Sequence, residues 1–320
     1  MTDRLDWKFG TEGLELIMKI GIRSIERGER LLMSVAEEVW NHKFITTNGI
    51  KLHYVTQGEG PLMLMLHGFP EFWYSWRHQI REFSKEYKVI ALDLRGYNDS
   101  EKPKDLAAYH ISEVLKDIEG VIRELGYERC VLVGHDWGGS IAWTFAYDYP
   151  EIVKCLIVMN APHLARFREG LHNPQQLLRS WYIFFFQLPW LPELLLRAGD
   201  YRLIKGMFSG TMINKRALTP IDLEAFKEAA AKPGALTAMV NYYRNVFQSK
   251  IVRRSILEVP TLMIWGESDV ALAKDLTYGT DSYVRDFQIQ YIPNCSHWVQ
   301  QEQPESVNQL IWRFLAKGNL

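Results

Sequence analysis

Three side chains that could share one chemical task, Asp136, Asp269 and His297, occur in that order along the chain. A carboxylate can act as a nucleophile, and a histidine oriented by a second carboxylate can act as a general base. The sequence therefore predicts one site for covalent catalysis, provided that the fold brings these distant residues together.

Asp136 lies in the stretch GHDWGG, residues 134–139, directly after the apolar residues Val131–Val133. Small residues on both sides of one reactive side chain are typical of a nucleophile elbow, a tight turn from a strand to a helix. The strained turn exposes its central side chain, which is commonly serine and is aspartate here. An aspartate after a strand is otherwise a helix N-cap, but the flanking glycines favour the elbow.

The other two candidates follow the last two predicted strands, and a parallel sheet places functional groups at the carboxyl ends of its strands. Asp269 ends the segment WGESD (265–269), and His297 lies in NCSHW (294–298). Taken singly, Asp269 would be a helix cap and His297 a hydrogen-bonded core residue. Together they have the order nucleophile, acid, histidine, which predicts a catalytic triad.

A fourth element, the turn from His67 to Pro70, follows the buried strand predicted over Leu62–Leu66. Such a turn leaves the Phe69 backbone N–H free to point at a ligand. Together with the N–H of Trp137 it predicts an oxyanion hole, in which each donor stabilises a negative transition state.

Alternating strands and helices must position these residues. Asn48-Gly49 predicts a hairpin between Phe44–Thr46 and Lys51–Thr56. The later alternation predicts an α/β fold with parallel strands joined by right-handed crossovers after this antiparallel start. The expected strands are 62–66, 89–92, 131–133, 156–159, 261–265 and 288–292, and the expected helices include 111–125, 140–149, 271–278 and 304–316.

The strand rhythm stops between about Leu164 and Ser255, where the chain is helical in pattern and rich in aromatic residues. We therefore expect residues 164–255 to form a helical cap inserted into one core domain, built from residues 41–163 and 256–320. Residues 1–40 are predicted to be an N-terminal helical extension. Charged residues interrupt the segment 14–40, so it cannot span a bilayer, and packing against the domain is favoured over membrane-surface contact.

Composition excludes several classes of protein. The 320 residues are 47% apolar with a net charge of −1, so they can bury a sizeable core and show no preference for nucleic acid. The three widely spaced cysteines, Cys130, Cys155 and Cys295, indicate buried thiols in a reducing compartment, hence a cytoplasmic location. Since no His/Cys cluster has metal-ligand spacing, no metal site is predicted.

Five motifs carry a resemblance to a known family: HGFPEFWYSW (67–76), DLRGY (93–97), GHDWGG (134–139), WGESD (265–269) and HWVQQEQPE (297–305). Together they resemble the soluble α/β-hydrolase-fold epoxide hydrolases, from about Phe44 onward. The resemblance implies an eight-stranded, mostly parallel sheet with helices on both faces and an inserted lid. Asn98 and Cys295-Ser296 depart from the family pattern, which usually has glycine there.

The resemblance also implies two lid tyrosines that hold an epoxide oxygen. Tyr182 and Tyr243 match these positions, and Tyr242 is the neighbour that could replace Tyr243. Further substrate contacts are expected from four residues, His67, Trp73, Phe185 and Trp298.

The activity that follows is hydrolysis of an apolar epoxide to a vicinal diol. Asp136 would form an alkyl ester, and water activated by His297 and Asp269 would hydrolyse it, without a cofactor. The alternatives are a haloalkane dehalogenase with the same nucleophile and, less favoured, a non-catalytic ligand receptor on the same fold. The sequence leaves open whether the chain is a monomer or a homodimer.

Overall fold

The computed structural model describes residues 40–247 and 255–317. The chain divides into two compact units, residues 1–40 and 41–320, and every described residue except Trp40 belongs to the second. The predicted N-terminal helix therefore lies outside the described residues, apart from Trp40.

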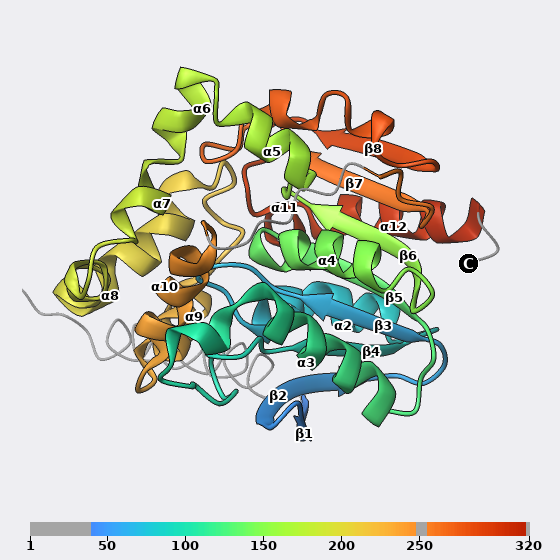
Figure 1. The fold of residues 1–320 in the computed structure, drawn as a ribbon, viewed down its shortest axis with the longest axis horizontal. Helices are drawn as coiled ribbons and strands as arrows, with labels where there is room; N and C mark the ends of the chain where they lie inside the picture. Colours follow the sequence, from blue (N-terminus) through green and yellow to red (C-terminus); the bar gives the residue numbers. More distant parts are fainter. Residues whose placement is uncertain (1–39, 248–254, 318–320) are drawn as a thin grey trace, which may run out of the picture. The chain divides into compact units, whose positions relative to one another are not determined.

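An eight-stranded sheet forms the centre of the second unit (Figure 1). Its spatial order is β1-β2-β4-β3-β5-β6-β7-β8, with antiparallel pairing of β1, β2 and β4 and parallel pairing from β4 through β8. This arrangement confirms the predicted α/β-hydrolase fold. The strands are β1 (Asn41–Thr47), β2 (Ile50–Gln57), β3 (Leu62–Leu66), β4 (Lys88–Leu92), β5 (Cys130–His135), β6 (Val153–Met159), β7 (Thr261–Gly266) and β8 (Phe287–Ile292).

The hairpin between β1 and β2 forms at the predicted turn. Asn48 and Gly49 have φ values of 48° and 70°, and two successive positive φ values define the turn type that matches the twist of a hairpin. Thr47 pairs with Ile50 directly across this turn.

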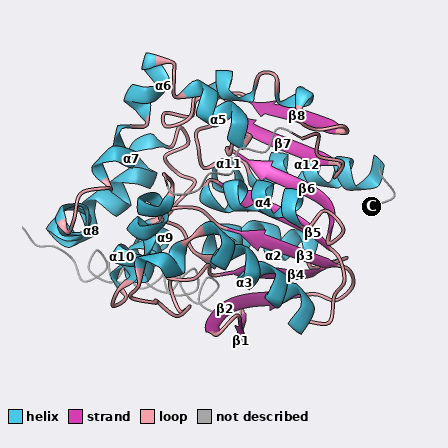
Figure 2. Ribbon diagram, viewed as in Figure 1, coloured by secondary structure: helices cyan, strands magenta, loops and turns pink. Residues whose placement is uncertain are grey.

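Helices cover both faces of the sheet (Figure 2): α3 and α4 lie on one face, and α2 and α12 on the other. The central strands β3 and β5 are buried along their whole length, which explains their unbroken apolar runs. The helices that accompany the sheet, outside the segment between β6 and β7, are α2 (Arg77–Phe83), α3 (Ile111–Glu124), α4 (Trp137–Asp148), α11 (Val299–Glu302) and α12 (Pro304–Lys317).

Among the described residues between β6 and β7, six helices follow one another: α5 (Leu164–Gly170), α6 (Pro174–Arg179), α7 (Trp181–Phe185), α8 (Leu191–Thr211), α9 (Pro220–Ala231) and α10 (Ala235–Asn245). They lie toward the carboxyl ends of the parallel strands (Figure 1). α8 is broken where Ala198 is extended and residues 199–201 have left-handed φ values. No strand occurs in residues 164–247, as the sequence predicts.

Two predicted elements differ from the structure. α4 begins at Trp137 rather than Ser140, because the elbow leads directly into the helix. The helix predicted over 271–278 is only a short 3₁₀ turn, Lys274–Thr277. The backbone is extended at Ala273 and at Tyr278, on either side of this turn, so no helix runs through them, and the Ala273 N–H donates to Gln176.

The three cysteines are buried and unpaired, and burial raises the pKa of the Cys130 and Cys155 thiols. Within residues 40–247 and 255–317, no helix combines the length and the apolar character needed to cross a bilayer.

Candidate active site

Asp136 occupies a strained turn between β5 and α4. Its φ of 51° and ψ of −119° are unfavourable for a residue with a side chain, at a cost on the order of 1–3 kcal/mol. The turn is tight enough to require glycine on both sides: a Cβ on Gly134 would overlap the Gly138 carbonyl, and one on Gly138 would overlap the Leu66 carbonyl. The glycines that identify the elbow in the sequence are thus required by close backbone packing.

The turn after β3 holds the Asp136 carboxylate. The Phe69 N–H donates to Asp136 Oδ1 over 2.8 Å, and a Cβ on Gly68 would overlap the Asp136 side chain. The second predicted donor, the Trp137 N–H, belongs to the first turn of α4, where backbone N–H groups have no partner within the helix.

His297 lies between the two aspartates of the predicted triad. Its Nδ1 is 2.6 Å from Asp269 Oδ2, and its Nε2 is 3.5 Å from Asp136 Oδ2. Asp136 and Asp269 are 133 positions apart in sequence, and Asp269 and His297 are 28 positions apart. The fold brings all three together at the carboxyl ends of β5, β7 and β8. The imidazole is placed to interact with whatever is bound to Asp136.

Asn160, directly after β6, fixes the orientation of Asp269, and no role was predicted for it from the sequence. Its Nδ2 donates to Asp269 Oδ2 over 2.7 Å, while its Oδ1 accepts from the Gly266 N–H over 2.9 Å. Asn160 is fully buried and has a φ of 41°. The available signal was a polar residue directly after a buried parallel strand, the same signal that identified Asp136 and Asp269.

The charges of the triad shift its pKa values strongly. Burial by itself would lower the pKa of His297, but Asp269 and Asp136 together raise it well above its ordinary value. Burial would raise the pKa of Asp269, yet His297, the Leu272 N–H and Asn160 together lower it. The two aspartates thus favour the protonated form of His297, and His297 in turn favours the ionised form of Asp269.

A further buried carboxylate, that of Glu71, bonds both the turn after β3 and the residue before Asp136. Glu71 is 0% exposed, and it accepts from the Gly68 N–H over 2.9 Å and from His135 Nδ1 over 2.7 Å. The other ring nitrogen of His135 is 2.9 Å from the His297 carbonyl oxygen. Burial would raise the pKa of Glu71, but His135 and the hydrogen bonds from Ser75 and Gly68 lower it to about 2.

The predicted lid tyrosines lie together. The Tyr243 ring meets Trp137 edge-on at 5.1 Å between centroids, and it lies 5.9 Å from the Tyr182 ring. Burial raises the pKa of both hydroxyls, and the charge of Asp136 raises each of them further. Tyr242 is used differently, because its hydroxyl donates to the Arg95 carbonyl over 2.9 Å.

The four expected substrate contacts divide into two groups. His67 is fully buried and both ring nitrogens have backbone partners, Gly68 O and Leu94 N, which argues against a substrate contact. The Trp73 ring packs on His42, Phe72 and Tyr74, none of which belongs to the triad.

Trp298 and Phe185 are closer to the predicted site. The Trp298 ring meets the His297 ring edge-on at 4.9 Å, and its Nε1 donates to Thr211 Oγ1. Phe185 is partly buried and contacts Phe186, whose ring lies 4.8 Å from Tyr243.

A cavity of about 640 Å³ adjoins the elbow, between α3, α4, α5 and α10. Its lining is mainly apolar and includes Val114, Trp137, Ile141, Phe167, Leu171 and Phe247. Trp137, the residue after the candidate nucleophile, therefore borders an apolar space that is large enough for a small organic molecule.

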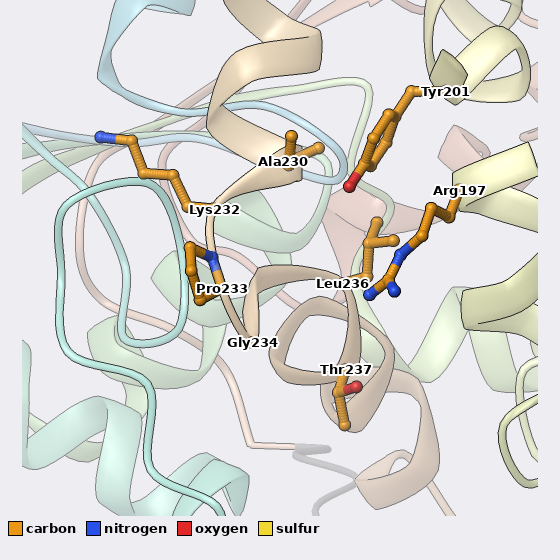
Figure 3. Close-up of a pocket in the computed structure, with 9 residues that line it drawn as sticks. Arg197, Tyr201, Ala230, Lys232, Pro233, Gly234, Leu236 and Thr237 are labelled. Carbon is orange, nitrogen blue, oxygen red and sulfur yellow. The ribbon is translucent and has the colours of Figure 1, made fainter.

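A separate cavity of about 300 Å³ lies between α8, α9 and α10 (Figure 3). Arg197, Tyr201, Leu236 and Thr237 line it, and it shares no residue with the triad. Lys232 also borders it, but the ammonium group pairs with Asp99. In the described part of the chain, no group of three or more His, Cys, Asp or Glu residues is arranged to hold a metal ion.

Comparison with known proteins agrees with this geometry. Residues 61–304 match a family model described as alpha/beta hydrolase fold. Epoxide hydrolase 4 of Homo sapiens is 46% identical over 281 residues, which cover 85% of this chain and 78% of that protein. Epoxide hydrolase 3 of Xenopus tropicalis is 47% identical over 281 residues, covering 85% of this chain and 77% of that protein.

Solved structures show the same relationship. A Bacillus megaterium epoxide hydrolase in complex with an inhibitor superimposes with a TM-score of 0.82 at 38% identity, covering 86% of this chain and 100% of that chain. The match extends over the sheet and the inserted helices alike, and the chain belongs to the epoxide hydrolases of the α/β-hydrolase fold.

Proposed function

We propose that the protein converts small apolar epoxides and water to vicinal diols in two covalent steps centred on Asp136. The observation that carries this proposal is the environment of the Asp136 carboxylate. One oxygen lies 2.8 Å from the Phe69 N–H and the other 3.5 Å from His297 Nε2, and both lid tyrosine hydroxyls are affected by its charge. A carboxylate in such a position can attack an sp³ carbon and form an ester.

The first step opens the ring. A carboxylate oxygen of Asp136 forms a bond to one ring carbon, and the bond between that carbon and the epoxide oxygen breaks. The epoxide oxygen, which becomes an alkoxide, accepts hydrogen bonds from the Tyr182 and Tyr243 hydroxyls and then a proton from one of them, which is left as a tyrosinate. Burial and the charge of Asp136 raise the pKa of both hydroxyls, which favours the protonated form that can donate to the epoxide oxygen.

The second step hydrolyses the ester. Water gives a proton to His297 Nε2 and attacks the ester carbonyl carbon of Asp136. The Phe69 and Trp137 N–H groups stabilise the resulting oxyanion, and the bond between the acyl carbon and the alkyl oxygen breaks. The leaving alkoxide takes the proton from His297 and departs as the diol. The second proton of the water, left on the Asp136 carboxyl group, restores the proton that the site supplied in the first step. The Phe69 N–H already holds the carboxylate oxygen in the resting site, so the same donor is available for the oxyanion.

The charge of Asp136 orders the two steps. In the resting site, Asp269 and Asp136 raise the pKa of His297 well above its ordinary value, which favours the protonated imidazole, a form that cannot act as a base. Ester formation removes the charge on Asp136, and the pKa of His297 falls. His297 can then return its proton to the tyrosinate left by the first step and act as the base in the second.

The surroundings favour an apolar substrate. The rings of Phe69, Phe186 and Tyr243 pack against one another above the nucleophile, and the cavity that begins at Trp137 is mainly apolar. We also propose that residues 164–255 act as the cap over a core of residues 41–163 and 256–320. The cytoplasmic location likewise stays a prediction of the sequence.

Two substrates test the proposed reaction. The protein is incubated with styrene oxide and with 1-bromobutane, and diol and bromide are measured separately, with Asp136→Ala as the inactive control. Diol from styrene oxide, absent in the control, is the expected result. Bromide without diol would identify a dehalogenase instead, and neither product would favour a ligand receptor.

A further inference from the structure

Several hydrogen bonds hold the loop that carries His297, among them one from the Ser268 N–H to the Cys295 carbonyl over 2.9 Å. The His297 carbonyl accepts from His135, as described above. The Ser296 N–H donates to Glu302 Oε2 over 2.7 Å, and Trp298 Nε1 donates to Thr211 Oγ1 over 2.8 Å. Thr211 is the last residue of α8, so the Trp298 contact joins the loop to the inserted helices. Ser296 is joined to the same region through Glu302.

Glu302 joins the two segments directly. Its second oxygen, Oε1, accepts from the Ile213 N–H over 2.6 Å and from the Asn214 N–H over 3.3 Å. The side chain is buried, with 4% of the residue exposed. One carboxylate thus bonds the turn after α8 on one side and the residue preceding His297 on the other.

These partners explain why glutamate occupies this position. A buried carboxylate is costly, and here its described partners are neutral donors, so only several hydrogen bonds can offset the loss of hydration. Both oxygens must accept, because N–H groups face the carboxylate from both sides. A glutamine has one acceptor oxygen, and its amide would turn a donor toward one of the two loops.

We propose that Glu302 is a positioning residue for the hydrolysis step, through which the inserted helices set the position of the His297 imidazole. The proposal rests on the two-step reaction proposed above. Glu302 acts through the backbone of Ser296 and does not touch the reacting atoms. Ring opening is independent of it, because Asp136 is held by Phe69 and the tyrosines belong to α7 and α10.

The test compares Glu302→Gln with Glu193→Gln. Glu193 is also a largely buried glutamate of this region, but it pairs with Arg244 between α8 and α10 and has no contact with the His297 loop. Alkyl-enzyme is formed by rapid mixing with styrene oxide, and its appearance and decay are followed by quenching and intact mass measurement.

In Glu302→Gln we expect the ester to decay about tenfold more slowly, which corresponds to about 1.4 kcal/mol and lies within the range typical of coupling through such contacts. Ester formation should stay within twofold of the unmodified protein. In steady state kcat and KM should fall together while kcat/KM is kept, because kcat/KM reports only on steps through alkylation. A merely structural role would lower the melting temperature without this split.

Thr211→Val is the second variant, for the case that Glu302→Gln does not fold. It removes only the hydroxyl that binds Trp298, and it should slow ester decay two- to fivefold without changing ester formation. Wild-type decay in the variant that folds, equal slowing of both steps, or the same slowing in Glu193→Gln would overturn the proposal. His297→Gln distinguishes failure of the Glu302 proposal from failure of the proposed reaction. If this variant accumulates no alkyl-enzyme, the two-step reaction itself is wrong, whatever the result for Glu302.

Discussion

Asp269→Asn changes a single group of the triad and has a consequence that follows from hydrogen-bond directions. Asp269 Oδ1 accepts from the Ala271 and Leu272 N–H groups over 2.8 and 2.9 Å. Oδ2 accepts from Asn160 over 2.7 Å and from His297 Nδ1 over 2.6 Å. All four partners donate, and an asparagine has only one oxygen that accepts.

The oxygen of Asn at position 269 should stay with the two backbone N–H groups, which are fixed by the turn after β7. Its NH₂ group then faces His297 Nδ1, which must accept, so the proton of the neutral ring moves to Nε2. An imidazole in that tautomer cannot take a proton from water at Asp136. In a serine protease triad the corresponding change lowers kcat by about 10⁴, or about 5.5 kcal/mol.

We therefore expect Asp269→Asn to lower the rate of ester hydrolysis by about 10⁴-fold, while the rate of Asp136 alkylation changes less than about tenfold. Single-turnover mixing with styrene oxide should give full alkyl-enzyme, seen as a mass increase of one substrate, and almost no diol. Glu267→Gln is the control, since Glu267 lies two residues before Asp269 and pairs with Lys274 at the surface. Diol release within tenfold of the unmodified protein, or equal loss of both steps, would refute the tautomer argument.

Three further changes test other parts of the site. Tyr182→Phe combined with Tyr243→Phe should lower alkylation by at least about 10²-fold, measured by single-turnover mixing, and retained epoxide turnover would show that another donor protonates the alkoxide. In H₂¹⁸O the first turnover should give diol without ¹⁸O, because water attacks the Asp136 carbonyl; labelled diol in that turnover would mean direct attack on the epoxide. Glu71→Gln should lower the free energy of unfolding at pH 7 by up to about 3 kcal/mol, since the pKa of Glu71 is lowered from 4.5 to about 2. That contribution is present above pH 4.5 and lost as the pH falls toward 2, so urea unfolding should show a smaller difference between pH 7 and pH 3 in the variant than in the unmodified protein.

The features that could be predicted from sequence have causes that act over a few residues. The sequence is apolar throughout β3 and over residues 130–133 of β5 because both faces of these strands are buried. Asn48-Gly49 is recognisable as a turn because it tolerates positive φ. The elbow is recognisable for a similar reason, since Gly134 and Gly138 are needed by the backbone itself.

The features that were missed depend on distant partners. The segment 271–278 has a helical pattern, but its backbone is extended at Ala273, whose N–H donates to Gln176, about 100 residues away. Asn160 resembles any polar residue after a strand until β7 is placed beside β6 and Asp269 comes within 2.7 Å. His67 matched the family motif, yet its place in the turn gives both ring nitrogens to the backbone.

Tyr242 and Tyr243 illustrate how far sequence can go and what the fold adds. Both rings lie edge-on to Trp137, at 5.8 Å for Tyr242 and 5.1 Å for Tyr243. Successive helix residues differ by about 100° in direction, so the two side chains still have different further partners. Tyr242 turns toward the sheet, where its hydroxyl bonds to the Arg95 carbonyl and its ring lies 5.5 Å from that of Tyr97. Tyr243 turns toward Phe69 and Trp137, the two residues whose N–H groups form the proposed oxyanion hole. One turn of helix thus supplies both an anchor to the core and the proposed proton donor, so the anchor fixes the direction in which the donor points.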